Sequence, residues 1–215
     1  MIKYRYFGIM LLVIDMRSIE NTILSEYEIQ KSKFITYLFP IHSLEEVEQN
    51  LKEVKHKSPN ATHYCYAYLF HNEKRCSDDK EPSGTAGMPI LNVLEKQNLN
   101  CVMAIVVRYF GGTLLGAGGL VRAYTTAVVE ALKKANYVSV FPGKEIELVF
   151  SYEKKQIIDG FLKNVIILKQ QFLDSISYQI LIPDTIFNTL QTQLKPHIFQ
   201  LSIIKDTDYI QKETT

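Results

Sequence analysis

The spacing of apolar residues in the first two thirds of the chain predicts alternating strands and helices. Side chains alternate between two faces over residues 62–70, which predicts a strand. A nearly continuous apolar run at 101–110 predicts a second strand that is covered on both faces. Residues 27–39 predict a further strand or hairpin arm, and residues 89–99 predict a short helix after a polar loop. This part of the chain is therefore expected to be α/β.

Two longer helices are predicted within the same part. Ser43-x-x-Glu46 forms a capping box, and it precedes apolar residues at helical spacing. The inward-facing residues of this helix are Leu44, Val47, Leu51 and Val54. A second helix carries one apolar stripe, made of Leu120, Ala123, Tyr124, Ala127, Val128, Ala131 and Leu132.

The last third of the chain follows a β-α-β-β-α-β order. Phe141-Pro142-Gly143 predicts a turn and a domain boundary. Strands are predicted at 146–151, 166–173, 176–182 and 198–204, and helices at 157–165 and from 184 to 194. This order is the split-βαβ or ferredoxin-like pattern. We therefore expect an α+β chain with an N-terminal extension at 1–19, a first domain at 20–141 and a ferredoxin-like domain at 142–215.

Composition narrows the classes of partner. Hydrophobic residues make up 47% of the chain and charged residues 22%, as in globular proteins. The net charge is +1, so no whole-chain field directs the protein to nucleic acid or membrane. The three cysteines, Cys65, Cys76 and Cys101, include no C-x-x-C pair. This argues against a disulfide framework or structural zinc, and it fits a reducing compartment.

The apolar run at residues 7–14 is too short to span a bilayer, which needs about 20 residues. Asp15 and Arg17 follow it without a small-residue cleavage site, so it does not match a signal peptide. We expect a cytoplasmic protein in which Met16 is an alternative start to Met1.

Most of the glycines lie in two loops, and these loops contain the candidate binding residues. Seven of the ten glycines lie between residues 84 and 119, in two loops. The second loop leaves a strand and enters a helix, where free N–H groups and the helix dipole favour an anion. Its candidate ligand- or nucleic-acid-binding residues are Arg108, Tyr109, Gly111, Gly112, Gly116, Gly118, Gly119 and Arg122.

In this hypothesis Arg108 at the strand end and Arg122 in the first helical turn supply forked donors to the anion. The loop is neither a Walker A motif nor G-x-G-x-x-G. The alternative is a tight connection whose glycines allow close packing of the helix on the sheet.

The first loop gathers carboxylates, and its candidate site residues are Asp78, Asp79, Glu81, Ser83 and Thr85. Three carboxylates within four residues can hold a hard cation or divide acid and base roles. The alternative is a solvated loop or a helix N-cap with ordinary turn chemistry, because no metal-ligand spacing is present.

Two features of the strand at 62–70 have a catalytic or binding interpretation beside a structural one. His63-x-Cys65, with Cys76, offers ligand atoms, but i,i+2 neighbours on a strand seldom reach one another, which favours a buried cysteine and a hydrogen-bonded histidine. The aromatic stripe Tyr64, Tyr66, Tyr68 and Phe70 can stack nucleobases, but without interleaved basic residues it favours core packing.

Three stretches together resemble the IMPACT family, in particular its bacterial, YigZ-like branch. They are THYCYA at 62–67, DDKEPSGTAGMPIL at 78–91 and VVRYFGGTLLGAGGLVRAY at 106–124. The resemblance implies a first domain like the second domain of ribosomal protein S5 and a ferredoxin-like second domain similar to domain V of elongation factor G. It also implies a role in translation, since eukaryotic relatives bind a large activator protein of an initiation-factor kinase and the bacterial branch is described as nucleic-acid- or ribosome-associated.

The chain departs from the family pattern at three positions. Lys80 replaces a glycine, while Met88 and Leu114 stand where the family often has lysine. The absence of both lysines weakens the case for an anion site at these loops.

The resulting functional hypothesis is a translation-associated regulator that binds RNA, the ribosome or a translation-factor partner. The alternatives are an enzyme acting on a phosphorylated small molecule, and a protein-interaction module that binds no nucleic acid. We expect no cofactor, no metal, no membrane partner and no assigned catalytic residue. The oligomeric state stays open.

Overall fold

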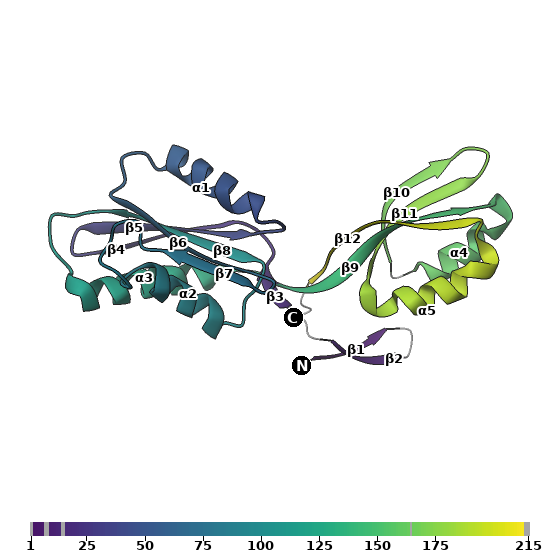
Figure 1. Ribbon diagram of the computed structural model, residues 1–215, viewed down its shortest axis with the longest axis horizontal. Coiled ribbons are helices and arrows are strands. Elements are labelled where there is room, and N and C mark those ends of the chain that lie inside the picture. The colour runs from purple at the N-terminus through teal and green to yellow at the C-terminus, as the bar shows by residue number, and fades with distance from the viewer. Residues whose placement is uncertain (1, 7–8, 14–15, 164, 213–215) are drawn as a thin grey trace. The chain divides into compact units, whose positions relative to one another are not determined.

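The structure is a computed structural model that describes residues 2–6, 9–13, 16–163 and 165–212 (Figure 1). The chain divides into two compact units. Of the described residues, 16–139 and 212 form the first, here called the N-terminal unit, and 140–163 and 165–211 form the second together with 2–6 and 9–13. The expected α+β chain with two main sheets is confirmed, one sheet lying in each unit.

A five-stranded antiparallel sheet forms the centre of the N-terminal unit. In spatial order its strands are β4 (Ile23–Ile29), β5 (Ser32–Pro40), β8 (Val102–Tyr109), β6 (His63–Phe70) and β7 (Glu73–Ser77). The segment predicted as one strand or hairpin arm is a hairpin, with Gln30 and Lys31 at positive φ between its arms. A short strand, β3 (Met16–Ile19), pairs with β9 instead.

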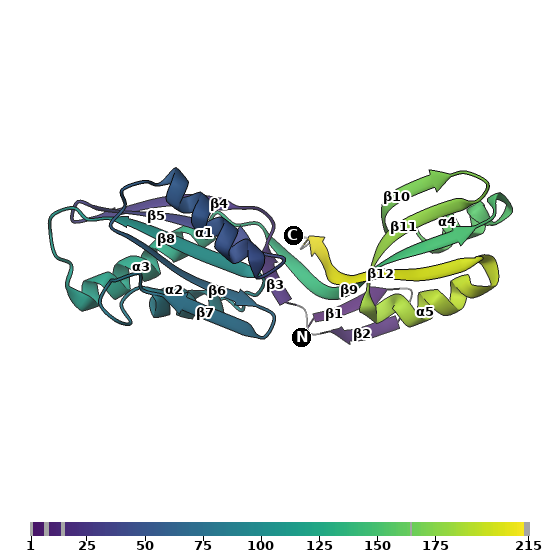
Figure 2. The ribbon, with the colours of Figure 1, turned by 45° about the horizontal axis from the view of Figure 1, so that its top comes forward.

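Helices cover both faces of this sheet (Figures 1 and 2). α1 (Glu45–Lys57) packs on one face, and α2 (Gly87–Lys96) and α3 (Gly116–Leu132) pack on the other. The central strand β8 contributes alternate residues to both cores, which confirms a strand covered on both sides. Every residue of the predicted stripe on α3 is buried.

The aromatic stripe of β6 packs in the core beneath α1. Tyr68 is buried, and Tyr64, Tyr66 and Phe70 are partly buried against the same cluster. The core-packing interpretation of these four rings therefore has direct support, because they contact side chains of α1 and β8.

Three local predictions are wrong. The predicted capping box does not form: α1 begins at Glu45 without a side-chain cap, and the Glu46 carboxylate accepts a hydrogen bond from His42 N instead. The stretch after residue 70 is not all loop, because β7 adds an edge strand whose polar side chains gave no strand pattern.

The predicted turn at Phe141-Pro142-Gly143 is the third, because β9 (Tyr137–Phe150) runs through it without a break. Gly143 faces Pro183 across the sheet, and a Cβ there would lie 2.7 Å from the Ile182 carbonyl oxygen. Glycine at this position thus permits close strand pairing rather than a turn.

The second unit has the predicted β-α-β-β-α-β order. Its elements are β9, α4 (Lys155–Phe161), β10 (Ile166–Phe172), β11 (Ile176–Pro183), α5 (Asp184–Leu194) and β12 (Gln200–Lys212), with single 3₁₀ turns at Tyr152–Lys154 and Lys195–His197. The strand order β10-β11-β9-β12 is ferredoxin-like. One apolar core joins the sheet to α4 and α5.

The hairpin of β1 (Ile2–Tyr6) and β2 (Ile9–Val13) includes the middle of the apolar run predicted at 7–14. Residues 7, 8 and 14 of that run lie outside the described part. Within the described residues, no helix combines the length and hydropathy that crossing a bilayer requires.

Close approach of two backbones explains one glycine of the second loop. Gly111 lies against the β4–β5 turn, and a Cβ there would lie 2.0 Å from the Lys31 carbonyl carbon. Gly111 N also donates to Ser32 Oγ at 3.2 Å. The loop after β8 is therefore held against the hairpin by contacts that only glycine allows.

We expect Gly111→Ala to lower the free energy of unfolding of the N-terminal unit by about 3 kcal/mol or more, because backbone has to move. Urea denaturation measures the loss. Gly118→Ala is the matched control: it lies within α3, its Cβ meets only Arg122 Nη1 at 3.7 Å, and alanine is favoured there by about 1 kcal/mol. Equal stability of the two variants would contradict the packing argument.

Candidate ligand pocket between the two loops

The two glycine-bearing loops meet at a pocket of about 400 Å³ in the N-terminal unit. The start of β6, the acidic loop, the end of β8 and the start of α3 supply its walls. The lining residues are Thr62, His63, Lys80, Glu81, Pro82, Arg108, Phe110, Leu114, Leu115, Gly116, Ala117 and Leu120. Segments up to 58 positions apart thus form one cavity of the size that small ligands occupy.

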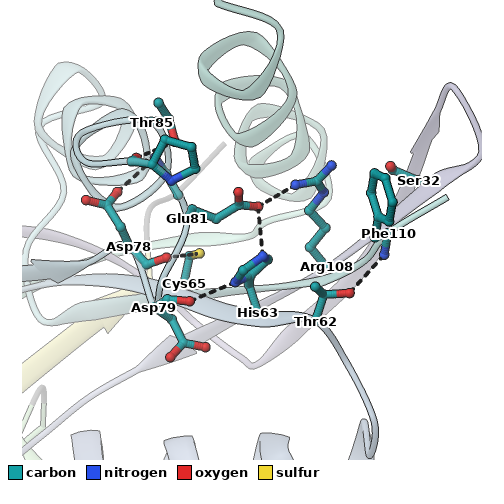
Figure 3. Close-up of polar contacts among 12 residues, drawn as sticks. Ser32, Thr62, His63, Cys65, Asp78, Asp79, Glu81, Thr85, Arg108 and Phe110 are labelled. Atoms are coloured by element: carbon teal, nitrogen blue, oxygen red, sulfur yellow. Dashed lines mark hydrogen bonds and ion pairs between the residues drawn. The ribbon is translucent and has the colours of Figure 1, made fainter. Parts of the chain in front are cut away.

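Two lining residues of the pocket, Glu81 and Arg108, form a buried ion pair (Figure 3). Arg108 Nη1 donates to Glu81 Oε1 at 2.6 Å, and the two side chains are 6% and 3% exposed. The Tyr124 hydroxyl donates to the same oxygen at 2.9 Å. One carboxylate oxygen thereby joins the acidic loop, the end of β8 and the middle of α3.

The rest of the Arg108 guanidinium has aromatic neighbours. Its central carbon lies 5.6 Å from the centre of the Phe34 ring and 5.5 Å from that of Phe110. Arg108 Nε is buried and has no hydrogen-bond partner among the residues that the structure describes. An unmade hydrogen bond of this kind is destabilising, so Arg108 is satisfied only in part within the protein.

His63 and Cys65 do not form a pair. His63 Nδ1 donates to the Asp79 carbonyl at 2.8 Å, which directs Nε2 toward Glu81 Oε1, 3.8 Å away. The Cys65 sulfur lies 3.0 Å from the Asp78 carbonyl oxygen and 3.3 Å from the Tyr124 hydroxyl. Cys76 instead contacts Met88.

Burial controls the ionisation of this network. It raises the pKa of the Cys65 thiol to about 12, so the thiol stays protonated at neutral pH and is a poor nucleophile. Burial, followed by the neighbouring Cys65 and Glu81, also raises the pKa of Tyr124. Tyr124 therefore remains a hydrogen-bond donor to Glu81.

The three carboxylates of the first loop are separated rather than clustered on an ion. Asp78 accepts hydrogen bonds from Gly84 N, Ala86 N and Gly87 N at 2.8, 3.0 and 2.8 Å. Asp79 Oδ2 accepts from Tyr64 N at 2.6 Å. Each carboxylate thus has its own protein donors, which supports the structural interpretation of the acidic loop over a cation site.

Two further candidates in this loop have modest roles. The Thr85 hydroxyl donates to the Pro82 carbonyl at 2.6 Å, so Thr85 stabilises the turn rather than facing the pocket. Ser83 is exposed. Neither residue lines the cavity.

The paired arginines of the anion hypothesis do not come together. Arg108 is buried against Glu81, while Arg122 is exposed and lies outside the pocket lining. α3 begins at Gly116, so Arg122 lies in its second turn rather than in the first. The helix starts earlier than the apolar stripe indicated because glycine-rich residues 116–119 carry little periodic signal.

Of the remaining candidate residues of the second loop, one lines the pocket and the others lie outside its lining. Gly116 lines the pocket at φ +69°, and Gly112 has φ +82°. Gly118 and Gly119 lie within the first turn of α3, outside the lining. The Tyr109 hydroxyl donates to the Pro59 carbonyl at 3.1 Å.

Of the twelve residues that line this pocket, the sequence predicted only Glu81, Arg108 and Gly116 as site residues. Thr62, Phe110 and Leu114 are among those that it missed, and His63 was expected to be a hydrogen-bonded histidine rather than a ligand. Phe110 N donates to Thr62 Oγ1 at 3.0 Å, which joins the ends of β6 and β8. Phe110 and Leu114 are 45% and 86% exposed, unusual values for large apolar side chains. Their position beside the glycines was the available signal, but apolar residues in a loop indicate no particular chemistry.

Comparison with known proteins gives a consistent set of relatives. The family model described as the Impact N-terminal domain matches residues 30–132. An IMPACT family member of Haemophilus influenzae is 44% identical over 119 residues, or 53% of this chain and 58% of that protein. The IMPACT family member YigZ of Escherichia coli is 37% identical over 140 residues, or 63% of this chain and 69% of that protein. The chain thus spans little more than half of the first of these relatives.

The fold also occurs in a solved structure described as that of a hypothetical protein. It overlays with a TM-score of 0.64 at 29% sequence identity, covering 90% of this chain and 99% of that one. The two units together therefore have a known structural counterpart.

We expect Arg108→Met to lower the free energy of unfolding by about 3–5 kcal/mol, because Glu81 is left buried without its cation. Adding Glu81→Gln removes the second charge and should restore much of that loss, since Tyr124 still has an acceptor. Urea denaturation of both variants tests the pair. A double variant no more stable than the single one would show that charge pairing is not what Arg108 contributes.

Asp78 provides a pH-dependent contribution. Burial alone would raise its pKa, but the donors Gly84 N, Gly87 N and Ala86 N outweigh burial and lower the pKa. The ionised carboxylate therefore stabilises the folded state above the unfolded pKa, about 3.9, and this stability disappears as pH falls through the lower folded pKa. Asp78→Asn should destabilise the unit by about 1 kcal/mol at pH 7 and by less near pH 3.

Chemical denaturation at both pH values measures this difference. Glu73→Gln, at an exposed position of β7, is the control and should change stability little at either pH. A pH-independent loss in Asp78→Asn would exclude the charge as the cause.

Proposed function

The chain belongs to the IMPACT family, and we propose that it is a translation-associated regulator that binds ribosomal RNA through exposed cations around the second glycine loop. Family membership supports the general role, and the S5-like and elongation-factor-like domains implied by the resemblance fit it. The exposed charges of the N-terminal unit indicate which of its surfaces would contact ribosomal RNA.

The observation that carries the proposal is a set of three exposed cations beside this loop. Lys80 stands at the pocket mouth, Lys31 lies in the hairpin turn against Gly111, and Arg122 lies along the start of α3. Within the described part of the chain, none of the three makes an ion pair. Unpaired exposed cations are the groups that contact nucleic-acid phosphates.

The buried ion pair changes which residues are expected to bind. Arg108 is paired with Glu81 and nearly buried, so it is not one of the exposed cations that we propose to contact the backbone phosphates of ribosomal RNA. Lys80 adopts φ +69°, a conformation that favours glycine, and so accepts local strain of about 1–2 kcal/mol. In this chain the family's glycine is thus replaced by a cation at the pocket mouth.

We expect the protein to co-sediment with ribosomes at low salt and to dissociate in a high-salt wash, because phosphate contacts release counterions. Combining Lys80→Glu with Arg122→Glu should weaken co-sedimentation at least about tenfold and reduce the salt slope by about 0.7 for each lost contact on single-stranded RNA. Lys134→Glu is the control, since it is an exposed lysine just beyond the opposite end of α3 and should bind as the unaltered protein does.

Two results would contradict the proposal. One is co-sedimentation that the double variant leaves unchanged. The other is a salt-tolerant, nuclease-resistant complex, which would instead favour a protein-interaction module.

A further inference from the structure

Beyond ribosome association, we propose that the pocket between the two loops binds a terminal phosphate monoester of a nucleotide. The terminal phosphate would lie at the start of α3 above the Glu81–Arg108 pair, and the nucleoside would lie against Phe110. The pocket is separate from the exposed cations that carry the proposed ribosome contact, except for Lys80.

The volume of the pocket limits the size of the ligand. Its volume of about 400 Å³ lies in the range of small-ligand sites. Its two charged and buried lining residues, Glu81 and Arg108, form an ion pair, and the fully buried Tyr124 donates to Glu81. A pocket of this volume accommodates one nucleotide, which a terminal nucleotide or a free nucleotide supplies, rather than several consecutive nucleotides of a strand.

The donors around the pocket favour a doubly charged oxyanion. α3 has 17 residues and no side-chain cap, so the first N–H groups at Gly116 and Ala117 are available at the positive end of its dipole. The Lys80 ammonium is at the mouth. Glu81 is the single carboxylate in the lining, and it is paired with Arg108 and accepts a hydrogen bond from Tyr124. Its negative charge therefore does not cancel the positive charge of Lys80 and the helix N-terminus.

An independent observation also points to a missing acceptor. Arg108 lines the pocket with a side chain only 6% exposed, and its Nε has no partner among the described residues. An oxyanion seated beside the guanidinium, after a small shift of that group, supplies that acceptor and removes a destabilising unsatisfied donor.

The apolar side chains that line the pocket favour a ligand with a nucleoside attached to its phosphate. Phe110 is 45% exposed, and its ring lies over the Arg108 guanidinium. Pro82, Leu115 and Leu120 line the same cavity. An exposed ring beside a guanidinium is suited to a nucleoside phosphate, since nucleobases stack on aromatic side chains while the phosphate takes the donors.

Calorimetric titration with uridine monophosphate and with uridine tests the inference directly. We expect the monophosphate to bind at least about tenfold more tightly than uridine at low ionic strength, because only the former meets the helix N-terminus. Ala117→Glu should weaken the monophosphate at least about tenfold by placing a carboxylate where the phosphate lies. This variant should remain folded, since an acidic residue in the first turn of a helix is stabilising.

Ala117→Gln is the matched uncharged control and should bind within about threefold of the unaltered protein. Phe110→Ala should weaken uridine monophosphate about tenfold and leave inorganic phosphate unchanged. Equal binding of uridine and its monophosphate, or equal binding by the Glu and Gln variants at position 117, would overturn the proposal.

Oligonucleotides distinguish the source of the phosphate. A short RNA with a 5′-phosphate that binds more tightly than the mononucleotide assigns the pocket to RNA ends, and weaker binding assigns it to free nucleotides. Equal affinity for 5′-phosphate and 5′-hydroxyl RNA, combined with no mononucleotide binding, would overturn it. If the protein binds uridine monophosphate but does not co-sediment with ribosomes, only the proposed ribosomal role is contradicted.

Discussion

The buried contact between Glu81 and Arg108 is the interaction on which the rest of the N-terminal unit depends. Taking two charges out of water is unfavourable, and the pair is tolerated because its atoms lie 2.6 Å apart and Tyr124 donates to the same carboxylate. These three residues come from the acidic loop, the end of β8 and α3. Their mutual pairing therefore determines where both loops lie around the pocket.

The acidic loop shows how residues that resemble catalytic groups can serve the fold. Asp78 accepts from Ala86 N and Gly87 N at the start of α2, so its carboxylate satisfies two N–H groups there from nine positions before the first helical residue. Gly87 lies so close to Ser77 that a Cβ would meet its backbone at 2.8 Å. The loop is consequently packed tightly against β7, and its carboxylates are engaged with protein donors rather than a cation.

The N-terminal unit presents two kinds of positive group, which are exposed cationic side chains and the N-terminus of α3. Arg122 and Lys31 are exposed, whereas the first residues of α3, Gly116 and Ala117, line the pocket. Met88 and Leu114, where the resemblance implies lysine, are exposed and apolar. Lys80 lines the pocket in a backbone conformation that glycine would adopt more easily.

The sequence by itself determined the elements and their buried faces. The stripe on α3, the two-sided strand β8 and the β-α-β-β-α-β order of the second unit all follow from periodicity, which is a local property of neighbouring residues. Turns and caps were less reliable, as Pro142 within β9 and the absent cap at Ser43 demonstrate, because strand pairing and packing override local preference.

Only the tertiary structure decided the state of the charged residues. Arg108 looks like a free anion-binding group in sequence, yet its partner lies 27 positions away and Tyr124 reaches the same carboxylate from 43 positions away. The pocket likewise exists because β6, β8, α3 and the acidic loop converge. Periodicity records which side of an element is buried, but the partner that a buried charge finds there depends on how distant segments pack.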